Sequence, residues 1–507
     1  MIIDKLLNKI TMYRLTLYYL IALVIYAMIT GFFGLTLYGS VDILLSSVIV
    51  LSVCFISNWI FAKLFKAVTN VESVFITALI IILIFPMKFP HQAVGLIGVS
   101  LLAMGSKYLL TVEKRHLFNP AAVGVAMMSL LSAEHSATWW VGTPLLIVPT
   151  LIGGLLIVRK VQRMRMAVVF LVTYFVFAAG AALLHSNPIL SLWQRGAFSS
   201  ALFFFTFVML TEPLTSPSTK KMRTWYAIIV AALYSTPIVR LGGLVFTPEM
   251  ALVVGNIFSY VVNPKYRLEL PLIKKTQLSP DTFLFDFGLV KGFKFLPGQY
   301  MEWTLPHSNA DSRGNRRYFS LANSPHEGIS IAVKFYSPSS TYKRALLSLQ
   351  PGQKIVSSSL SGDFVMPTTR NTPLVFIAGG VGIAPFRSII EDIVEKKEQV
   401  NITVLFANKR KEDILFLDTL EKARAFGVNT FYILTDKTAI PAGWQGISGH
   451  VTPEIVKTSI PDYIKRKFYV SGPQLMVQNF EKILLSTGVL KKNIKVDFFP
   501  GYQETSA

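Results

Sequence analysis

The sequence has almost no cysteine and few charged residues. Cys54 is the only cysteine among 507 residues, and it lies inside an apolar run. A disulfide within the chain, a cysteine-ligated iron–sulfur cluster and a cysteine-ligated structural zinc site are therefore excluded. Charged residues make up 15% of the chain against 52% hydrophobic residues, and the mean hydropathy is +0.50. This balance excludes a single water-soluble domain.

The charged residues divide the chain near residue 262. Up to that point the chain has 18 Lys and Arg and 7 Asp and Glu. After it the chain has 31 Lys and Arg and 21 Asp and Glu. Both parts carry a similar positive net charge, but the first has about half as many charged residues. Its cations lie in short loops between apolar runs, as membrane topology requires, and no DNA-binding pattern is present. We expect a membrane part, then a soluble part, with membrane lipid and not nucleic acid as a partner.

The first part contains about ten apolar runs that suit a hydrocarbon layer of roughly 30 Å. No cleavable signal peptide is expected, because the first run is long, lacks a small-residue cleavage pattern and is followed by further runs. With a cytoplasmic N-terminus, most Lys and Arg fall on the inner side. We expect a multi-pass protein of the cell membrane with a cytoplasmic C-terminal domain. The runs lie near 15–35, 41–62, 72–86, 91–109, 118–132, 139–158, 166–185, 199–213, 224–240 and 248–262.

Two of these runs, the third and the eighth, are short and end in proline. They end at Pro86 and Pro213, and they hold matching positions if the ten runs divide five plus five. With five spans each, the two repeats would cross the membrane in opposite directions. The sequence therefore predicts an inverted repeat, with broken helices at the two short runs. Broken helices are tolerated where protein or a cavity satisfies the freed backbone groups, so the pair marks a candidate site near the membrane centre. Two ordinary short helices are the alternative.

Polar residues beside these runs are few. Asn119 and Pro120 open the fifth run, while Glu212 and Thr215 close the eighth. A helix cap at Asn119 and an interfacial charge at Glu212 are the alternative to a buried site.

A family resemblance rests on these residues. The motif at 118–121 (Phe-Asn-Pro-Ala), the run at 210–213 (Leu-Thr-Glu-Pro) with the Thr-Ser pair at 215–216, and the ten-run count resemble the D-type membrane protein of the Rnf electron transport complex. The homologous B-type membrane protein of the sodium-translocating NADH:quinone oxidoreductase is similar. The resemblance covers roughly 15–262. It implies flavin-mediated electron transfer through the membrane, often coupled to ion movement.

The same family implies a place for FMN. Its members carry FMN covalently on a threonine in an outer loop that reads Asp-x-x-Ser/Thr-Gly/Ser-Ala-Thr. The nearest match ends at Thr138, but Ser132 replaces the aspartate and His135 replaces the hydroxyl residue. Thr138 is therefore the candidate FMN residue, while the two departures argue against a covalent bond. A loop threonine that caps a helix is the alternative.

From Arg267 onward, short alternating runs with Gly and Pro suit first a β-barrel and then alternating strands and helices. In the first group, Arg317, Phe319 and Ser320 occupy one predicted strand. Such residues can pair with the pyrophosphate of a dinucleotide flavin, stack on its isoalloxazine ring and donate toward N5. A surface arginine beside a core aromatic is the alternative.

The helical run at 342–349 follows three hydroxyl residues that can hold a pyrophosphate, and a tight turn at 361–364 closes the barrel. In this order the segments resemble the FAD domain of the ferredoxin-NADP reductase superfamily, which implies FAD as the cofactor. The expected FAD-binding residues are Tyr300, Arg317, Tyr318, Phe319, Ser320, Ser339, Ser340 and Thr341.

The second group opens with a strand at 373–378 that runs into a glycine loop and a helix. Glycines let the backbone approach a pyrophosphate at a helix N-terminus, and the later strands at 402–407, 430–435 and 468–470 predict a doubly wound α/β domain. The same superfamily has a Gly-Gly-x-Gly-x-x-Pro loop, a Cys-Gly-Pro-x-x-Met turn and a terminal acidic-Phe-x-Gly-Tyr run. The counterparts here are 379–385, 471–476 and 497–502. The resemblance implies NAD(P) binding by Gly379, Gly380, Gly382, Pro385, Gly472 and Pro473.

The reacting groups implied by this resemblance are Ser320, Ser471 and Asp497, where Ser471 replaces a frequent cysteine but still offers a hydrogen bond. Lys409 and Arg410 follow a strand where the adenosine ribose would lie. They suit a 2′-phosphate, and a solvated basic turn explains them equally well, so NADH and NADPH both stay open.

We therefore expect three domains: an all-α transmembrane domain over 1–263, an FAD-binding β-barrel over 264–367 and an NAD(P)-binding α/β domain over 368–507. The predicted activity is that of a membrane-bound NAD(P)H dehydrogenase that passes electrons through FAD to a flavin or quinone, with or without ion translocation, and no metal site is expected. A quinone, a partner protein of the same complex and an extracytoplasmic flavoprotein are all compatible acceptors. The alternative is an ion or solute transporter with a regulatory reductase domain.

Overall fold

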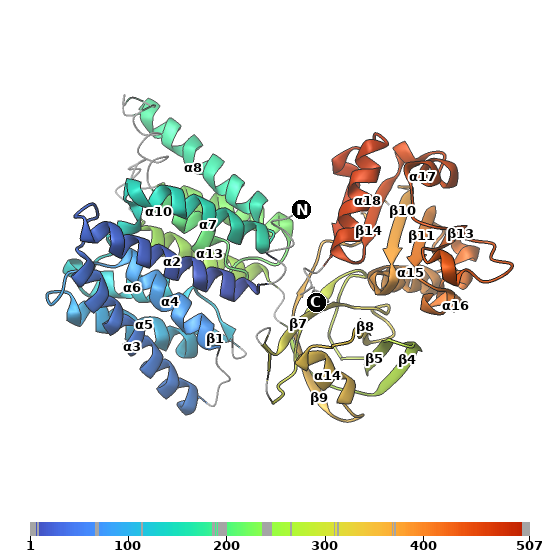
Figure 1. Cartoon of the computed structure of the whole chain (residues 1–507), viewed down its shortest axis with the longest axis horizontal. Coiled ribbons are helices and arrows are strands. Elements are labelled where there is room, and N and C mark those ends of the chain that lie inside the picture. Colours follow the sequence, from blue (N-terminus) through green and yellow to red (C-terminus); the bar gives the residue numbers. More distant parts are fainter. Residues whose placement is uncertain are drawn as a thin grey trace. The chain divides into compact units, whose positions relative to one another are not determined.

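The chain forms two compact units, a helical unit (Met1–Asn263) and a sheet unit (Pro264–Gln503), and each is described by itself (Figure 1). The computed structural model describes residues 7, 10–65, 70–112, 115–184, 188, 190, 200–235, 246–263, 266–308, 310–311, 314–367, 369 and 372–498.

Side-chain caps begin several helices of the helical unit. Thr11, Asn70, Asn119 and Thr247 each accept a backbone N–H from the first turn of the helix that follows them. The helices are α2 (Met12–Phe32), α3 (Ser40–Leu64), α4 (Val71–Ile84), α5 (Ala93–Leu109), α6 (Pro120–Leu131), α7 (Ile147–Lys160), α8 (Met164–Leu184), α10 (Ser200–Phe204), the π-helix η4 (Phe205–Leu210), α11 (Lys220–Tyr234) and α13 (Pro248–Val262).

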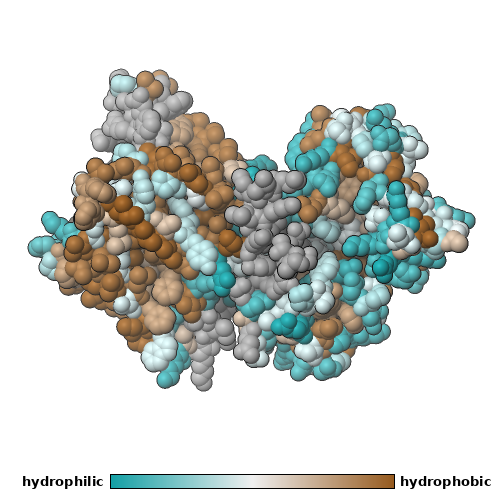
Figure 2. Space-filling model, in the orientation of Figure 1, coloured by the Kyte–Doolittle hydropathy of each residue, from teal (hydrophilic) through white to brown (hydrophobic). Residues whose placement is uncertain are grey.

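Three helices of the described residues, α2, α3 and α8, are long and apolar enough to cross a membrane. Only 33–39% of each apolar window is buried. Large apolar side chains such as Ile29, Val48 and Val176 are more than half exposed, and Figure 2 shows the helical unit largely covered by hydrophobic residues. Exposed apolar area of this extent is typical of a surface that contacts a protein partner or a membrane. Shorter apolar helices are α4, α5, α6, the segment Ala201–Leu210 and α13.

The helical unit repeats its packing pattern. In its first half α3 packs on α5, α5 on α6, and α4 on both α2 and α3. In its second half α8 packs on α11, α11 on α13, and η4 on both α7 and α8. Each of these first-half contacts thus has a counterpart in the second half. The halves meet where α6 packs on α13 and where α2 packs on α7.

The first part of the sheet unit is built from two antiparallel sheets, of order β3-β9-β6-β7 and β4-β5-β8. Alternating side chains of these strands bury Phe285, Met301 and Trp303 in one core, together with Tyr342 and Leu346 of the short helix α14. The elements are β3 (Arg267–Pro271), β4 (Lys274–Ser279), β5 (Thr282–Gly288), β6 (Tyr300–Thr304), β7 (Arg316–Ser320), β8 (Ile329–Lys334), α14 (Thr341–Ser348) and β9 (Lys354–Ser361).

The second part is a six-stranded parallel sheet of order β13-β12-β11-β10-β14-β15, which confirms the predicted parallel-sheet architecture. Every residue of β10 is buried, because apolar side chains cover both of its faces. Phe376 stacks on Phe386 on one face, and Ile377 packs with Leu484 on the other. The elements are β10 (Leu374–Gly379), α15 (Ala384–Lys396), β11 (Ile402–Asn408), α16 (Leu417–Lys422), β12 (Val428–Leu434), β13 (Ile447–Ser448), α17 (Pro453–Ser459), β14 (Lys467–Ser471), α18 (Gln474–Ser486) and β15 (Ile494–Asp497).

Gly427 immediately precedes β12, and its substitution tests how closely the chain packs at the start of this strand. It has φ +86°, and a Cβ there would lie 1.9 Å from the Val400 carbonyl oxygen. Gly443 has a similar φ of +76° but no atom within 4 Å of a built Cβ. We expect Gly443→Ala to destabilise the fold by about 1–2 kcal/mol, the strain of a left-handed alanine, and Gly427→Ala to cost about 2 kcal/mol more because the strand connection must also shift.

Thermal unfolding of both variants in mild detergent measures the difference, with Gly443→Ala as the matched control. Equal melting temperatures for the two variants would contradict this packing.

Candidate functional site

Three strands of the parallel sheet end side by side. Ala378 of β10 pairs with Ser471 of β14, which in turn pairs with Asp497 of β15. The chain leaves β10 toward β11 on one side, while β14 lies on the other. This is a topological switch point, where doubly wound sheets bind nucleotides beyond the carboxyl ends of their strands. Ser471 and Asp497 are thus placed together at the predicted nucleotide edge.

The turns after β10 and β14 approach each other through glycine backbone. A Cβ on Gly382 would lie 2.5 Å from the Ser471 carbonyl oxygen and 2.6 Å from the Cα of Gly472, and a Cβ on Gly379 would lie 2.1 Å from the Sδ of Met476. Gly380, with φ +51°, has no neighbouring atom within 4 Å of a built Cβ. The cradle is closed on the side of β14 and open at Gly380, as a dinucleotide pyrophosphate requires.

Two prolines border this cradle. Pro385 lies in the first turn of α15, where a missing N–H costs nothing, and Pro473 immediately precedes α18. The structure thus brings together the glycines and prolines predicted for nucleotide binding. The terminal run at 499–502 lies outside the described residues.

A buried amide ends the neighbouring strand β11. Asn408 is 4% exposed, and among the described residues neither atom of its side-chain amide has a hydrogen-bond partner. A buried amide of this kind suits a ligand with its own donors and acceptors, such as a nucleotide ribose. Sequence reasoning did not single out Asn408, although its position directly before Lys409 was the available signal.

The basic pair beside Asn408 is exposed and faces an acid. Lys409 and Arg410 are exposed, and the Nε of Arg410 lies 3.9 Å from Asp436, at the end of β12. Hydrogen bonds from Thr438 lower the pKa of Asp436, so this carboxylate is charged at neutral pH. The basic turn is therefore partly neutralised by an acid that no pattern in the sequence placed there.

The predicted flavin strand, β7, presents two different faces. Its partner β6 aligns Tyr300 with Ser320 and Glu302 with Tyr318, so these side chains share one face. Tyr318 is 40% exposed, lies edge-on to Tyr300 at 5.8 Å and donates to the Glu302 carboxylate at 2.8 Å. Half-exposed rings beside a hydroxyl fit a planar aromatic cofactor.

The other face of β7 carries Arg317 and Phe319, which point toward α14. The guanidinium of Arg317 stacks on Tyr342 at 4.9 Å, and Phe319 packs on the same ring at 6.2 Å. Phe319 is thus a partly buried neighbour of the core, while Tyr318 is the exposed ring of this strand.

The N-terminus of α14 gathers most of the residues predicted for the pyrophosphate. Ser340 caps the helix by accepting from the Lys343 N–H, whereas the Ser339 hydroxyl donates to the Tyr336 carbonyl. The Thr341 N–H donates to Asp311 at 3.1 Å, and Asp311 also lies 3.7 Å from Arg317. The structure therefore brings Arg317 and Thr341 together around a carboxylate, an anion in the position expected for phosphate oxygens.

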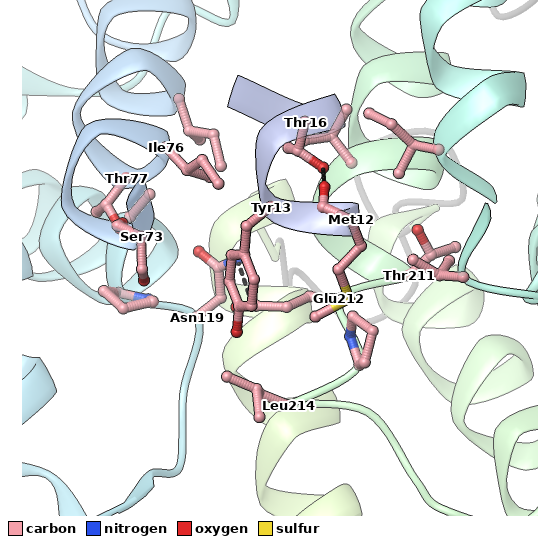
Figure 3. A pocket seen from close by; sticks show the side chains of 17 residues that line it. Met12, Tyr13, Thr16, Ser73, Ile76, Thr77, Asn119, Thr211, Glu212 and Leu214 are labelled. Carbon is pink, nitrogen blue, oxygen red and sulfur yellow. Dashed lines mark hydrogen bonds between the residues drawn. The ribbon is translucent and has the colours of Figure 1, made fainter. Parts of the chain in front are cut away.

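In the helical unit, a cavity of about 70 Å³, partly open to the surroundings, lies between the two halves (Figure 3). Asn119 caps α6 through the Ala122 N–H and also donates to Glu212 at 2.9 Å. It is therefore both the predicted cap and a partner of the carboxylate. Tyr13 and Thr211 add polar groups to the lining.

One further amide, bound to Asn119, joins the two halves of the helical unit. Asn256 of α13 is fully buried, accepts the Asn119 backbone N–H at 2.9 Å and donates to the Thr215 carbonyl and the Tyr226 hydroxyl. Sequence reasoning missed Asn256. The available signal was a polar residue in an otherwise apolar run, which is costly in a membrane and usually functional or structural.

At the first predicted break, polar groups satisfy the backbone carbonyls that the helix leaves free. The carbonyls of Ile82 and Ile84, at the end of α4, accept from the Trp140 indole at 2.7 Å and from the Thr138 backbone at 3.0 Å. The second break is a π-helix, η4, a form found frequently at functional sites.

Thr138 itself is exposed. It lies before Trp139, which is the cap residue of the next helical turn, so Thr138 is not the helix cap that sequence reasoning offered as the alternative.

Comparisons with known proteins agree with the geometry of the sheet unit. Residues 376–482 match the oxidoreductase NAD-binding domain family. NADH-cytochrome b5 reductase 1 of Laccaria bicolor is 31% identical over 236 residues, which cover 44% of this chain and 74% of that protein. The corresponding protein of Aspergillus terreus is 29% identical over 244 residues, 46% of this chain and 81% of that protein.

Among solved structures, the FAD/NAD-binding domain of a nitric oxide dioxygenase from Vibrio cholerae matches with 21% identity and a TM-score of 0.41 over 46% of this chain and 99% of that domain. The relatives confirm the prediction of a reductase, whereas the resemblance of the helical unit to the Rnf membrane protein stays a prediction. Through its sheet unit, the chain belongs to the NADH-cytochrome b5 reductase family and is an FAD-dependent NAD(P)H oxidoreductase.

Proposed function

We propose that the protein is a membrane-bound NADH dehydrogenase whose sheet unit takes electrons from NADH and whose helical unit passes them to a flavin or a quinone. The observation that carries this proposal is the presence in one chain of a reductase and of helices that expose apolar faces and enclose a cavity lined in part by Asn119 and Glu212. An anchored reductase would need one apolar helix, whereas three long ones and several shorter ones are present.

The FAD site is proposed on the exposed face of β6 and β7. FAD, when bound, takes a hydride from the nicotinamide and can release electrons singly. The rings of Tyr300 and Tyr318 would support the isoalloxazine, and Ser320 would donate a hydrogen bond to it. Arg317, with Ser339, Ser340 and Thr341 at the start of α14, would hold the pyrophosphate in place of Asp311.

The nucleotide site is proposed on the glycine cradle. Gly380 leaves room for the pyrophosphate at the start of α15, and Gly382 lets the turn after β14 pack against this loop. Ser471 and Asp497 would flank the position of the nicotinamide at the ends of β14 and β15. Asn408 would hold the adenosine ribose. The charge of Asp436 beside Arg410 disfavours a 2′-phosphate, so we infer NADH as the donor.

The helical unit is proposed to be a ten-helix inverted repeat. Its paired contacts support this arrangement, as does the pair of breaks after α4 and at η4. The cavity at Glu212 is then the acceptor site between the repeats, and Thr138 is a second, exposed position for FMN. The cytoplasmic placement of the sheet unit follows from the cations of the inner loops.

The competing proposal is an ion or solute conduit regulated by the reductase, which a carboxylate facing a cavity also suits. Vesicles that contain the purified chain distinguish the two. NADH oxidation that ionophores leave unchanged favours electron transfer without ion coupling.

The flavin content tests the relay. We expect acid extraction of the purified chain to release one FAD per chain, with a second flavin bound to the helical unit, both bleached by NADH without oxygen. FAD alone would exclude Thr138 as an attachment site and leave a quinone as the acceptor.

Glu212→Gln tests the cavity. The change keeps the size of the side chain but removes its charge from a buried network, so we expect quinone reduction to fall about tenfold or more. NADH–ferricyanide activity, which needs only the sheet unit, should stay within about twofold. Glu134→Gln, an exposed acid of the same unit, is the control, and equal quinone rates for the two variants would argue against this site.

Asp436→Ala tests donor selection. Removal of the carboxylate frees Arg410 for a 2′-phosphate, so we expect kcat/KM for NADPH to rise about fivefold or more while the value for NADH changes less than about twofold. Steady-state kinetics with both nucleotides measure this. An unchanged NADPH/NADH ratio would contradict the placement of the ribose at this edge.

A further inference from the structure

The barrel segment that follows the flavin strand is bound to the helix that follows the nucleotide cradle. This segment, 322–324, begins two residues after Ser320, and α15 begins directly after the glycine turn. The Ser388 hydroxyl donates to the Asn323 carbonyl at 2.7 Å. The Ser324 hydroxyl donates to Glu395 at 2.6 Å.

At the centre of this contact lies an ion pair on α15. Arg387 and Glu391 approach to 2.5 Å, with side chains only 13% and 10% exposed. Arg387 donates to the Ala322 carbonyl at 2.9 Å and lies over the ring of Phe416 at 4.5 Å. Glu391 accepts the backbone N–H of Ser324 at 3.1 Å. Each member of the pair therefore holds one backbone group of segment 322–324.

These contacts join the two halves of the reductase site. Segment 322–324 continues from the strand that carries Ser320, while α15 continues from the turn that holds Gly380 and Gly382. A shift between them would change the separation of the flavin and the nicotinamide, and misplacement of reacting groups by about 1 Å can cost 100-fold in rate.

We infer that Arg387 and Glu391 form a positioning latch, which when ionised holds the flavin strand against the nucleotide helix and when Glu391 is protonated lets the two separate and slows flavin reduction. The inference concerns only the reductase half-reaction and does not depend on the proposed path through the helical unit.

The carboxyl group of Glu391 changes its protonation state near neutral pH. Burial raises its pKa to about 7, against the opposing effect of Arg387, while Glu327 and Glu395 raise it further. Asp286 of β5 lies near Arg387 and Glu327, and Lys274 of β4 lies near Asp286. The latch is thus mostly ionised above about pH 7 and mostly protonated below it.

The stability of the fold changes with pH in the opposite direction to the expected rate of flavin reduction. The pKa of Glu391 is higher in the folded chain than its usual 4.5. Its contribution to stability is therefore fully present below pH 4.5 and is lost as the pH rises through about 7. The ionised latch aligns the site at the expense of stability, so flavin reduction and stability should change in opposite directions between about pH 6 and pH 8.

The test uses the full chain in mild detergent with its FAD content measured. Stopped-flow mixing with saturating NADH, without oxygen, gives the rate of flavin bleaching. In the wild type we expect this rate to fall about tenfold from pH 8 to pH 6. Glu391→Gln should be slow and lose this pH dependence. Glu395→Gln should keep it with the inflection at lower pH, because Glu395 raises the pKa of Glu391.

The variant Arg387→Gln provides a second test of the latch. Loss of the guanidinium removes the group that lowers the pKa of Glu391, so the inflection should move to higher pH. A pH profile of Glu391→Gln that matches the wild type, loss of the inflection in Glu395→Gln, or an unmoved inflection in Arg387→Gln would each overturn the latch.

Melting temperatures across the same pH range test the latch without turnover. The wild type should lose stability as the pH rises through about 7, and Glu391→Gln should not. A wild-type flavin that NADH fails to bleach would contradict the reductase assignment, and these melting curves would then still decide the latch.

Discussion

The close approach of two backbone turns at Gly382 and Gly472 is the constraint on which the reductase site depends. No side chain fits between the turns, because a Cβ at Gly382 would lie within 2.7 Å of three backbone atoms of the facing turn. This contact fixes the start of α15 against the end of β14. It thereby sets Ser471 and Asp497 beside the open position at Gly380, and the Arg387–Glu391 pair carries the same alignment one helical turn further, to the flavin strand.

The helical unit meets a different constraint, that of interrupted apolar helices. In the membrane position that we propose for it, each break would leave backbone groups that lipid cannot satisfy. At the end of α4 the loop around Trp140 supplies the donors, and after η4 a chain of Asn119, Glu212, Thr215 and Asn256 supplies both donors and acceptors. Asn119 and Glu212 of this chain also line the cavity between the two halves, which we propose as the acceptor site.

Local patterns in the sequence predicted those parts of the fold that depend on neighbouring residues. The strand at 373–378, the glycine turn and the helix after Pro385 follow one another in the chain, and the structure has them as β10, a turn and α15. A cap at Asn119 was one of the two interpretations that the sequence allowed, because an N-cap depends only on the residues that follow it. Contacts between distant residues gave no such signal. Asp311 reaches the N-terminus of α14, Asn256 joins the two halves of the helical unit, and Glu391 meets Ser324. In each case the partners are far apart in the chain and ordinary in type, so only the fold brings them together.

Electron transfer from NADH into a membrane by one chain is the central claim. The most direct measurement uses lipid vesicles that contain the purified chain, a membrane-soluble quinone and trapped ferricyanide, with NADH added outside. We expect the trapped ferricyanide to be reduced, and its reduction to be lost without the protein. Reduction of ferricyanide added outside, with the trapped pool unchanged, would contradict the claim and leave the helical unit without a part in electron transfer.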